Sequence, residues 1–153
     1  MHKKIIIAFT VGVLIAGWAV ASDDKTDVMA VVNQWDDGFN KGDMKSAVAA
    51  CADQTSIIDD LAPHEWHGAG ACSKWMKDAA AFFKKNEMTN VVSTLSKPRH
   101  VDVTGDRAYV VVPATLTYTE KGKPVKEDPA TVTMSLQKTA SGWRITGWAW
   151  ADG

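Results

Sequence analysis

Apolar residues near the start of the chain recur at intervals of three and four positions, a spacing that predicts an amphipathic helix. This helix is predicted to begin at Thr26 and to end before Gly42, since glycine just after a helix adopts a positive φ without strain. Asp36 and Asp37 fall on its predicted polar face. Its predicted apolar face contains Val28, Val31, Val32, Trp35 and Phe39.

Two further helices are predicted by the same spacing. Asp43 is placed to accept hydrogen bonds from the first free N–H groups of a second, shorter helix. A third helix is predicted after Gly70. The apolar face of the second helix contains Met44, Ala47, Val48 and Cys51, and that of the third contains Cys72, Trp75, Met76, Ala79, Phe82 and Phe83.

The remainder of the chain is predicted to be β-structure. A short strand over 55–58 ends at Asp59 and Asp60, before a break at Pro63. Further strands, separated by turn residues, are predicted over 91–95, 100–104, 107–119, 130–138 and 143–150. Helices followed by consecutive hairpins predict an α+β fold, with three N-terminal helices on one face of an antiparallel β-sheet.

The first 21 residues have the pattern of a secretory signal peptide. Lys3 and Lys4 precede an apolar run over 5–16, and Ala19-Val20-Ala21 matches the small-x-small pattern of a cleavage site. The alternative is an uncleaved membrane anchor, for which this apolar stretch is at the lower limit of length. We therefore expect an exported protein, periplasmic or secreted, without a stable membrane anchor after cleavage and with one domain over 22–153.

Composition narrows the class of protein but does not name a ligand. The formal net charge of −1 leaves no basic excess to neutralise a phosphate backbone, so we expect no nucleic-acid partner. The two cysteines, Cys51 and Cys72, are too few for a cysteine-rich zinc module. In an oxidising compartment they are expected to form a disulfide, the alternative being two buried thiols that act as small apolar groups.

Several short motifs resemble the superfamily of nuclear transport factor 2 (NTF2), ketosteroid isomerase and the SnoaL-like polyketide cyclases. The matching positions are Phe39-Asn40-Lys41-Gly42-Asp43, Ala52-Asp53, Asp59 and Trp66-x-Gly68, just before the third predicted helix. After Asn86 only the order of strands and turns matches. The resemblance implies a cone-shaped fold with a curved sheet, a pocket between sheet and helices, and commonly a homodimer.

The same resemblance places Asp59 where ketosteroid isomerases have their proton-shuttling aspartate. The alternative is an aspartate that only hydrogen-bonds the turn before Pro63. The tyrosine of the isomerase oxyanion hole is replaced by Trp35, and its second acid would fall near Thr133 or Met134. Because an indole donates one hydrogen bond but cannot share a proton as a phenol does, steroid isomerisation itself is not expected.

Two histidines lie in the segment His64-Glu65-Trp66-His67. It is one residue short of the zinc motif H-E-x-x-H, and in an extended segment His64 and His67 point to opposite faces. We therefore expect no metal site and no cofactor. His67 is the candidate pocket acid or base beside Asp59, and the alternative is a surface histidine on a short edge strand.

The tryptophans are candidates for lining the pocket. Strand alternation places Trp148 and Trp150 on one face of the last strand and Trp143 on the other. Tyr109 and Tyr118 lie on opposite faces of one strand, so at most one hydroxyl points inward. The predicted ligand-binding residues are Trp35, Trp66, Tyr118, Trp148 and Trp150, and a pocket of this kind favours a small apolar or aromatic ligand.

Two functional classes remain open at this point. The first is an exported SnoaL-like domain that binds a small molecule and catalyses proton transfer, cyclisation or hydrolysis with Asp59 as base. The second is a non-catalytic binding or dimerisation module of the same superfamily. Apolar residues on both faces of the strand over 107–119 also predict a homodimer formed through the outer face of the sheet.

Overall fold

A computed structural model describes residues 23–153, in which three helices pack on one seven-stranded sheet. The predicted signal peptide lies outside the described residues. The helices are α1 (Asp24–Lys41), α2 (Met44–Ala50) and α3 (Ala71–Lys85). The strands are β1 (Cys51–Ile58), β2 (Glu65–Ala69), β3 (Met88–Leu95), β4 (His100–Thr104), β5 (Arg107–Glu120), β6 (Lys123–Thr139) and β7 (Gly142–Asp152).

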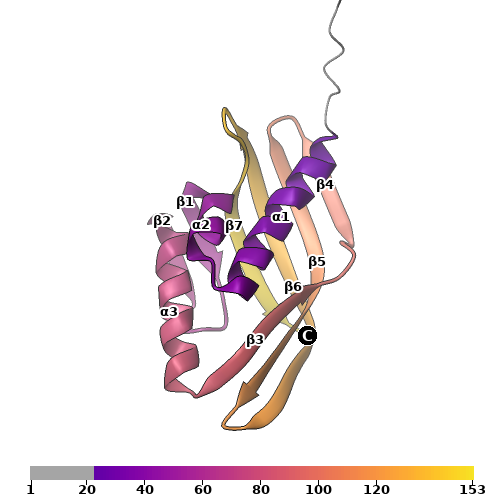
Figure 1. The fold of residues 1–153 in the computed structure, drawn as a ribbon. Coiled ribbons are helices and arrows are strands. Elements are labelled where there is room, and N and C mark those ends of the chain that lie inside the picture. Colours follow the sequence, from indigo (N-terminus) through magenta and orange to yellow (C-terminus); the bar gives the residue numbers. More distant parts are fainter. Residues whose placement is uncertain (1–22) are drawn as a thin grey trace, which may run out of the picture.

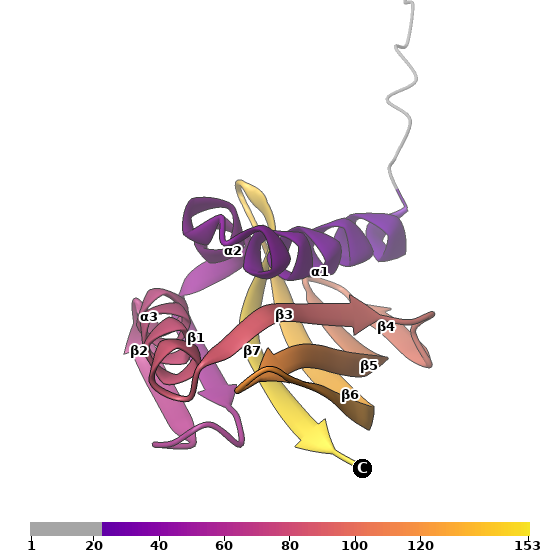
Figure 2. The same ribbon diagram turned by 60° about the horizontal axis from the view of Figure 1, so that its bottom comes forward.

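The sheet is curved and mixed, with the strand order β2-β1-β7-β6-β5-β3 and with β4 paired to β5. Consecutive hairpins make most pairs antiparallel, but β1 and β7 run parallel because the helices and the other strands separate them in the chain. The helices lie along one side of this curved sheet (Figures 1 and 2). The predicted α+β cone with three helices is confirmed, and the parallel pair is an addition to it.

The ends of the helices follow the sequence signals. Gly42 has φ 64° and its N–H donates to the Phe39 carbonyl at 3.0 Å, which ends α1. The Asp43 carboxylate accepts from the Ser46 N–H at 3.0 Å and so caps α2. Capping therefore fixes the sharp turn between α1 and α2.

The polar face predicted for α1 is corrected at Asp36, which is 9% exposed. Asn40, one turn further along, donates from its side-chain amide to the Ser93 carbonyl at 2.8 Å and accepts from the Ser93 N–H at 2.8 Å. This pair of hydrogen bonds holds β3 over the end of α1, so Asp36 is covered by a strand that helical periodicity cannot detect. Burial raises the pKa of Asp36.

The assignment of faces on β7 also needs a correction. Trp143, predicted to face away from Trp148, is buried in the same core at 2% exposure, compared with 4% for Trp148. The register between β6 and β7 shifts between Ser135 and Leu136. Such a bulge adds one residue and reverses the alternation beyond it. Strict alternation of side chains between the two faces therefore does not hold along β7.

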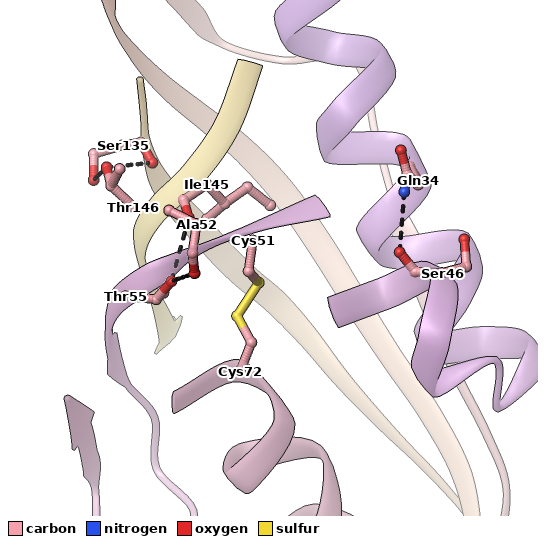
Figure 3. Close-up of a disulfide and its surroundings, with 9 residues drawn as sticks. All are labelled: Gln34, Ser46, Cys51, Ala52, Thr55, Cys72, Ser135, Ile145 and Thr146. Atoms are coloured by element: carbon pink, nitrogen blue, oxygen red, sulfur yellow. Dashed lines mark hydrogen bonds between the residues drawn. A yellow bond between two sulfur atoms is a disulfide. The ribbon is translucent and has the colours of Figure 1, made fainter. Parts of the chain in front are cut away.

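Cys51 and Cys72 are joined by the predicted disulfide, with their Cα atoms 6.5 Å apart (Figure 3). Cys51 begins β1 and Cys72 lies in the first turn of α3. The bond therefore fastens α3 to the sheet and closes the segment that carries Asp59. Within residues 23–153, no helix is both long and apolar enough to cross a membrane.

Candidate functional site

A cavity of about 400 Å³ lies between the helices and the sheet. Its residues come from α1, α3, the loop between β1 and β2, and the strands β3, β5, β6 and β7. The aromatic residues that line it are Trp35, Phe39, Trp75, Phe82, Phe83, Tyr118, Trp148 and Trp150. Four of the five residues predicted to bind a ligand therefore line the cavity: Trp35, Tyr118, Trp148 and Trp150.

Three tryptophans from different elements form one aromatic wall. Trp35 of α1 and Trp148 of β7 have ring centroids 5.1 Å apart, and Trp75 of α3 stands edge-to-face against Trp148 at 4.7 Å. Edge-to-face and tilted contacts are the arrangements that the quadrupoles of aromatic rings favour. The wall is thus fixed by contacts among its own members.

Asp59 lies at the carboxyl end of β1 and is 9% exposed. One carboxylate oxygen, Oδ1, accepts from the Leu61 backbone N–H at 2.8 Å, and the other, Oδ2, accepts from the Trp75 indole N–H at 3.0 Å. The carboxylate therefore has the placement that each alternative required, while its role in proton transfer stays a prediction. Asp59 hydrogen-bonds the turn before Pro63 and also lines the cavity.

The surroundings of Asp59 raise its pKa from 3.8 to about 7. Burial is the main cause, because a charged carboxylate loses its hydration. The negative charge of Asp60 raises the pKa further, while the N–H donors of Leu61 and Trp75 lower it by stabilising the anion. A carboxyl group with this pKa can accept a proton and return it near neutral pH.

A second polar pair lies on the strands β5 and β6. The Tyr118 hydroxyl donates to Glu127 Oε1 at 2.9 Å. Burial is the first cause of a raised pKa in both groups, and the pKa of Tyr118 reaches about 12. Both side chains line the cavity, and Tyr109 on the opposite face of β5 is exposed to solvent.

The family model of the SnoaL-like domain matches residues 28–149, which is most of the chain. The chain belongs to the SnoaL-like domain family. Comparison with curated proteins gives no match.

Solved structures support the fold of this SnoaL-like domain. An NTF2-like superfamily protein from Salmonella enterica is 16% identical, with a TM-score of 0.71 over 84% of this chain and 90% of that one. An NTF2-like protein with a cystatin-like fold from Novosphingobium aromaticivorans is 13% identical, with a TM-score of 0.69 over 84% and 81%. The CaMKII hub of S. rosetta is 19% identical, with a TM-score of 0.67 over 88% and 100%.

Two predicted site residues of the SnoaL-like domain lie away from the cavity. Trp66 is buried at 3% exposure, and its indole N–H donates to Asp78 Oδ2 at 2.8 Å, between β2 and α3. His67 lies on the edge strand β2, where its exposed side chain is 3.2 Å from Glu65. The geometry thus matches the alternative for His67, a surface histidine on a short edge strand. His64, which the sequence argument set aside, lines the cavity.

Three cavity acids were missed by the sequence argument: Asp60, Glu120 and Glu127. Tyr118 pairs with Val125 across the β5–β6 hairpin, so Glu127 is its diagonal neighbour on the same face. The turn at Lys121 and Gly122 is the sequence signal that could have revealed Glu127, because this turn sets the register of the hairpin. Asp60 could be found only by knowing the path of the loop after Asp59.

No acid lies at the sequence position that corresponds to the second acid of the isomerase oxyanion hole. Thr133 and Met134 are not among the cavity residues, and Met134 is fully buried in the core. Trp148 Nε1 has no hydrogen-bond partner among the described residues, but this atom is covered and is not presented to the cavity. Within 23–153 no group of three or more metal-ligating side chains comes together.

Proposed function

We propose that this protein is an exported SnoaL-like domain that binds a small apolar or aromatic molecule in its cavity and moves a proton on it through Asp59. The observation that carries the proposal is the Asp59 carboxylate, which lies against the tryptophan wall and has a pKa of about 7. An acid with this pKa is partly ionised at neutral pH. It can therefore act as a base in one step and as an acid in the next.

The size and lining of the cavity favour a small, flat ligand. A volume of about 400 Å³ is within the range of small-molecule pockets, roughly 300–1,000 Å³. Aromatic side chains supply most of its apolar wall, and a flat ring system can stack on them. The substrate that fits best is a hydrophobic carbonyl compound, whose α C–H is acidified by the carbonyl group.

Asp59 has a defined part in this chemistry. Its carboxylate takes the α-proton of the bound compound, which leaves an enolate, and the resulting carboxylic acid returns a proton to carbon. The Trp75 N–H donates to Oδ2 at 3.0 Å and so orients the carboxylate. The aromatic wall offers water few hydrogen-bonding partners, which favours transfer of the proton between Asp59 and the ligand. Isomerisation by proton transfer and cyclisation of a carbonyl compound each begin with such a step, whereas in a hydrolysis Asp59 would take its proton from the attacking water.

Export is supported by two features. The first is the signal-peptide pattern of residues 1–21, which directs a chain to the export machinery. A disulfide between Cys51 and Cys72 is the state expected in an oxidising compartment. Intact mass of the protein from its native host tests this, with a chain beginning at Ser22 expected and one that retains Met1 to Ala21 contradicting it.

Proton transfer is tested directly by hydrogen–deuterium exchange. 2-Tetralone, a flat bicyclic ketone with an acidic α C–H, is incubated with the protein in D₂O, and loss of the α-proton signal is followed by NMR. We expect wild type to accelerate exchange and Asp59→Asn to reduce the acceleration by at least roughly 100-fold, the usual contribution of one general base. The control Asp102→Asn removes an exposed carboxylate from β4, outside the cavity, and should exchange like wild type.

A non-catalytic binding module is the second candidate. The observation that favours it is the missing second acid near Thr133 and Met134, because an enolate would lack one of its stabilising donors. Binding of 2-tetralone without any acceleration of exchange supports this candidate against the first. If 2-tetralone shows neither binding nor exchange, the cavity as a site for neutral carbonyl compounds is contradicted under both proposals.

A further inference from the structure

The charge of the cavity points to the chemical class of its ligand. Four carboxylates line it: Asp59, Asp60, Glu120 and Glu127. Among these lining residues, all within 23–153, there is no lysine or arginine, and His64 is the one basic side chain. The whole chain has a formal net charge of only −1, so this excess of negative charge is local.

The four cavity carboxylates are not neutralised by ion pairs within the described part of the chain, as is also true of Asp36 and Asp102 outside the cavity. In the described part of the chain, ion pairs join a basic side chain to Asp24, Asp37, Glu65, Asp78, Asp106 and Asp128. None of the four cavity carboxylates forms an ion pair among residues 23–153. The hydrogen-bond partners of the Asp59 and Glu127 side chains are neutral N–H and O–H donors.

These carboxylates share one electrostatic field. The charge of Asp60 raises the pKa of Asp59, of Glu127 and of Tyr118, and the charge of Glu120 raises that of Tyr118 as well. Each effect is a repulsion that a positive charge placed among these groups would relieve. Burial strengthens that attraction, because the aromatic walls of the cavity lower the local dielectric constant.

The aromatic wall favours the same kind of ligand. The faces of tryptophan and tyrosine rings attract cations through their quadrupoles, most strongly where water is excluded. Trp35, Trp75 and Trp148 supply such rings beside Asp59, and Tyr118 supplies one beside Glu127. Apolar area and negative charge therefore line the same cavity.

We infer that the ligand of this cavity is a cation: a flat, apolar molecule that carries a positively charged nitrogen among Asp59, Asp60, Glu120 and Glu127. The inference rests on the proposed function and narrows its substrate class, from a hydrophobic carbonyl compound to one that also carries an amine, iminium or quaternary ammonium group. Such a ligand supplies the positive charge that the cavity lacks. It also leaves the tryptophan wall to contact the apolar body.

Three probes of nearly identical shape separate charge from apolar area. N-methylquinolinium is the cation, 1-methylnaphthalene is its uncharged isostere, and 1-naphthoate is an anion on the same ring system. Binding to the full chain after disulfide formation is measured by quenching of tryptophan fluorescence at pH 8, where Asp59 is mostly ionised. We expect the cation to bind at least roughly tenfold more tightly than the hydrocarbon, with the anion the weakest of the three.

Two variants show where the preference arises. Asp60→Asn removes one charge from the cavity at nearly constant shape. It should weaken the binding of N-methylquinolinium by roughly threefold or more and leave the affinity for 1-methylnaphthalene unchanged. Glu127→Gln should act in the same direction. Asp102→Asn removes the same charge from the exposed face of β4 and should change neither affinity.

Each outcome decides the inference. Equal affinity for cation and hydrocarbon, or tighter binding of the anion, overturns it while the proposed apolar binding function stands. An effect of Asp102→Asn as large as that of Asp60→Asn also overturns it, because net charge rather than the cavity would then be responsible. Failure of all three probes to bind contradicts the cavity as a ligand site, and so contradicts the proposed function together with this inference.

Discussion

At the scale of single residues, the hydrogen bond between Trp75 and Asp59 couples the aromatic wall to the acid. The indole N–H stabilises the charged form of Asp59, whereas burial and Asp60 oppose that form. Burial has the larger effect, since the pKa is raised to about 7. The carboxyl group is therefore balanced between two protonation states by contacts that can be changed one at a time.

Replacing Trp75 by phenylalanine keeps an aromatic ring and removes the N–H donor. We expect the pKa of Asp59 to rise further above 7, by about one pH unit, because the anion loses a hydrogen bond. Carbon-detected NMR titration of the carboxyl group measures it. Trp66→Phe is the matched control, since its indole donates to Asp78 outside the cavity. An unchanged or lowered pKa in Trp75→Phe would show that this bond does not tune Asp59.

The raised pKa of Asp59 also makes stability depend on pH. The folded protein holds the proton up to about pH 7, and the unfolded chain loses it near 3.8, so stability contributed by the neutral acid is lost as pH rises between these values. Asp59→Asn removes the charge that burial opposes. We expect the variant to exceed wild type in unfolding free energy by a few kcal/mol at pH 8 and by much less at pH 4.

Urea denaturation at the two pH values provides the measurement. Asp36 and Glu127 also have raised pKa values, but they are present in both proteins and cancel in the comparison. Asp102→Asn serves as the control for loss of a surface carboxylate. If Asp59→Asn is no more stable than wild type at pH 8, the charged form of Asp59 is not destabilising in the fold.

At the scale of secondary-structure elements, the disulfide fixes the position of α3 on the sheet. It joins the start of β1 to the first turn of α3, with a sequence separation of 21 between its cysteines. Between the two cysteines lie β1, the loop that carries Asp59, and β2. Beyond them α3 carries Trp75, so the bond constrains both partners of the central hydrogen bond.

Replacing both Cys51 and Cys72 by alanine should lower the unfolding free energy by roughly 3 kcal/mol, the value expected in the chain-entropy account for a loop of this length. Urea denaturation measures the loss. Reducing the disulfide of wild type should lower stability by a similar amount, and the same reductant should leave the double-alanine protein unchanged. Equal stability of the oxidised and reduced wild type would contradict this account.

The sequence predicts those elements whose signals are local. Gly42 and Asp43 mark the junction of α1 and α2, because a positive φ and a side-chain cap each act within one turn. The predicted exposure of Asp36 is wrong because β3 covers this residue. The predicted face of Trp143 is wrong because a bulge changes the alternation of β7. In the candidate site, Asp59, Trp35 and Trp148 could be named in advance, whereas Glu127 required the register of a hairpin.

At the scale of the whole molecule, the outer face of the sheet is more apolar than a solvated face requires. Tyr109 is 47% exposed on β5, and Val111 and Pro113 alternate with core residues on the same strand. A sheet with one solvated face should alternate more clearly between apolar and polar residues. This face is therefore the expected interface of a homodimer.

A charge in that face should dissociate the dimer. We expect wild type to sediment as a dimer at micromolar concentration and Val111→Glu to sediment as a monomer, because the interface would bury an unpaired carboxylate. Ala80→Glu, on the exposed face of α3, should remain dimeric. A monomeric wild type, measured by sedimentation velocity, would contradict the predicted interface.

The loop between β1 and β2 also has a consequence for how this fold could diversify. Asp59, Asp60, Leu61, Ala62 and His64 all come from this loop at one edge of the sheet, whereas the tryptophan wall comes from α1, α3 and the sheet interior. The candidate base Asp59 and the tryptophan wall are therefore encoded by separate segments. Exchanging the loop could install a different acid or base above an unchanged aromatic wall, so new chemistry can arise here without rebuilding the recognition of the ligand's apolar body.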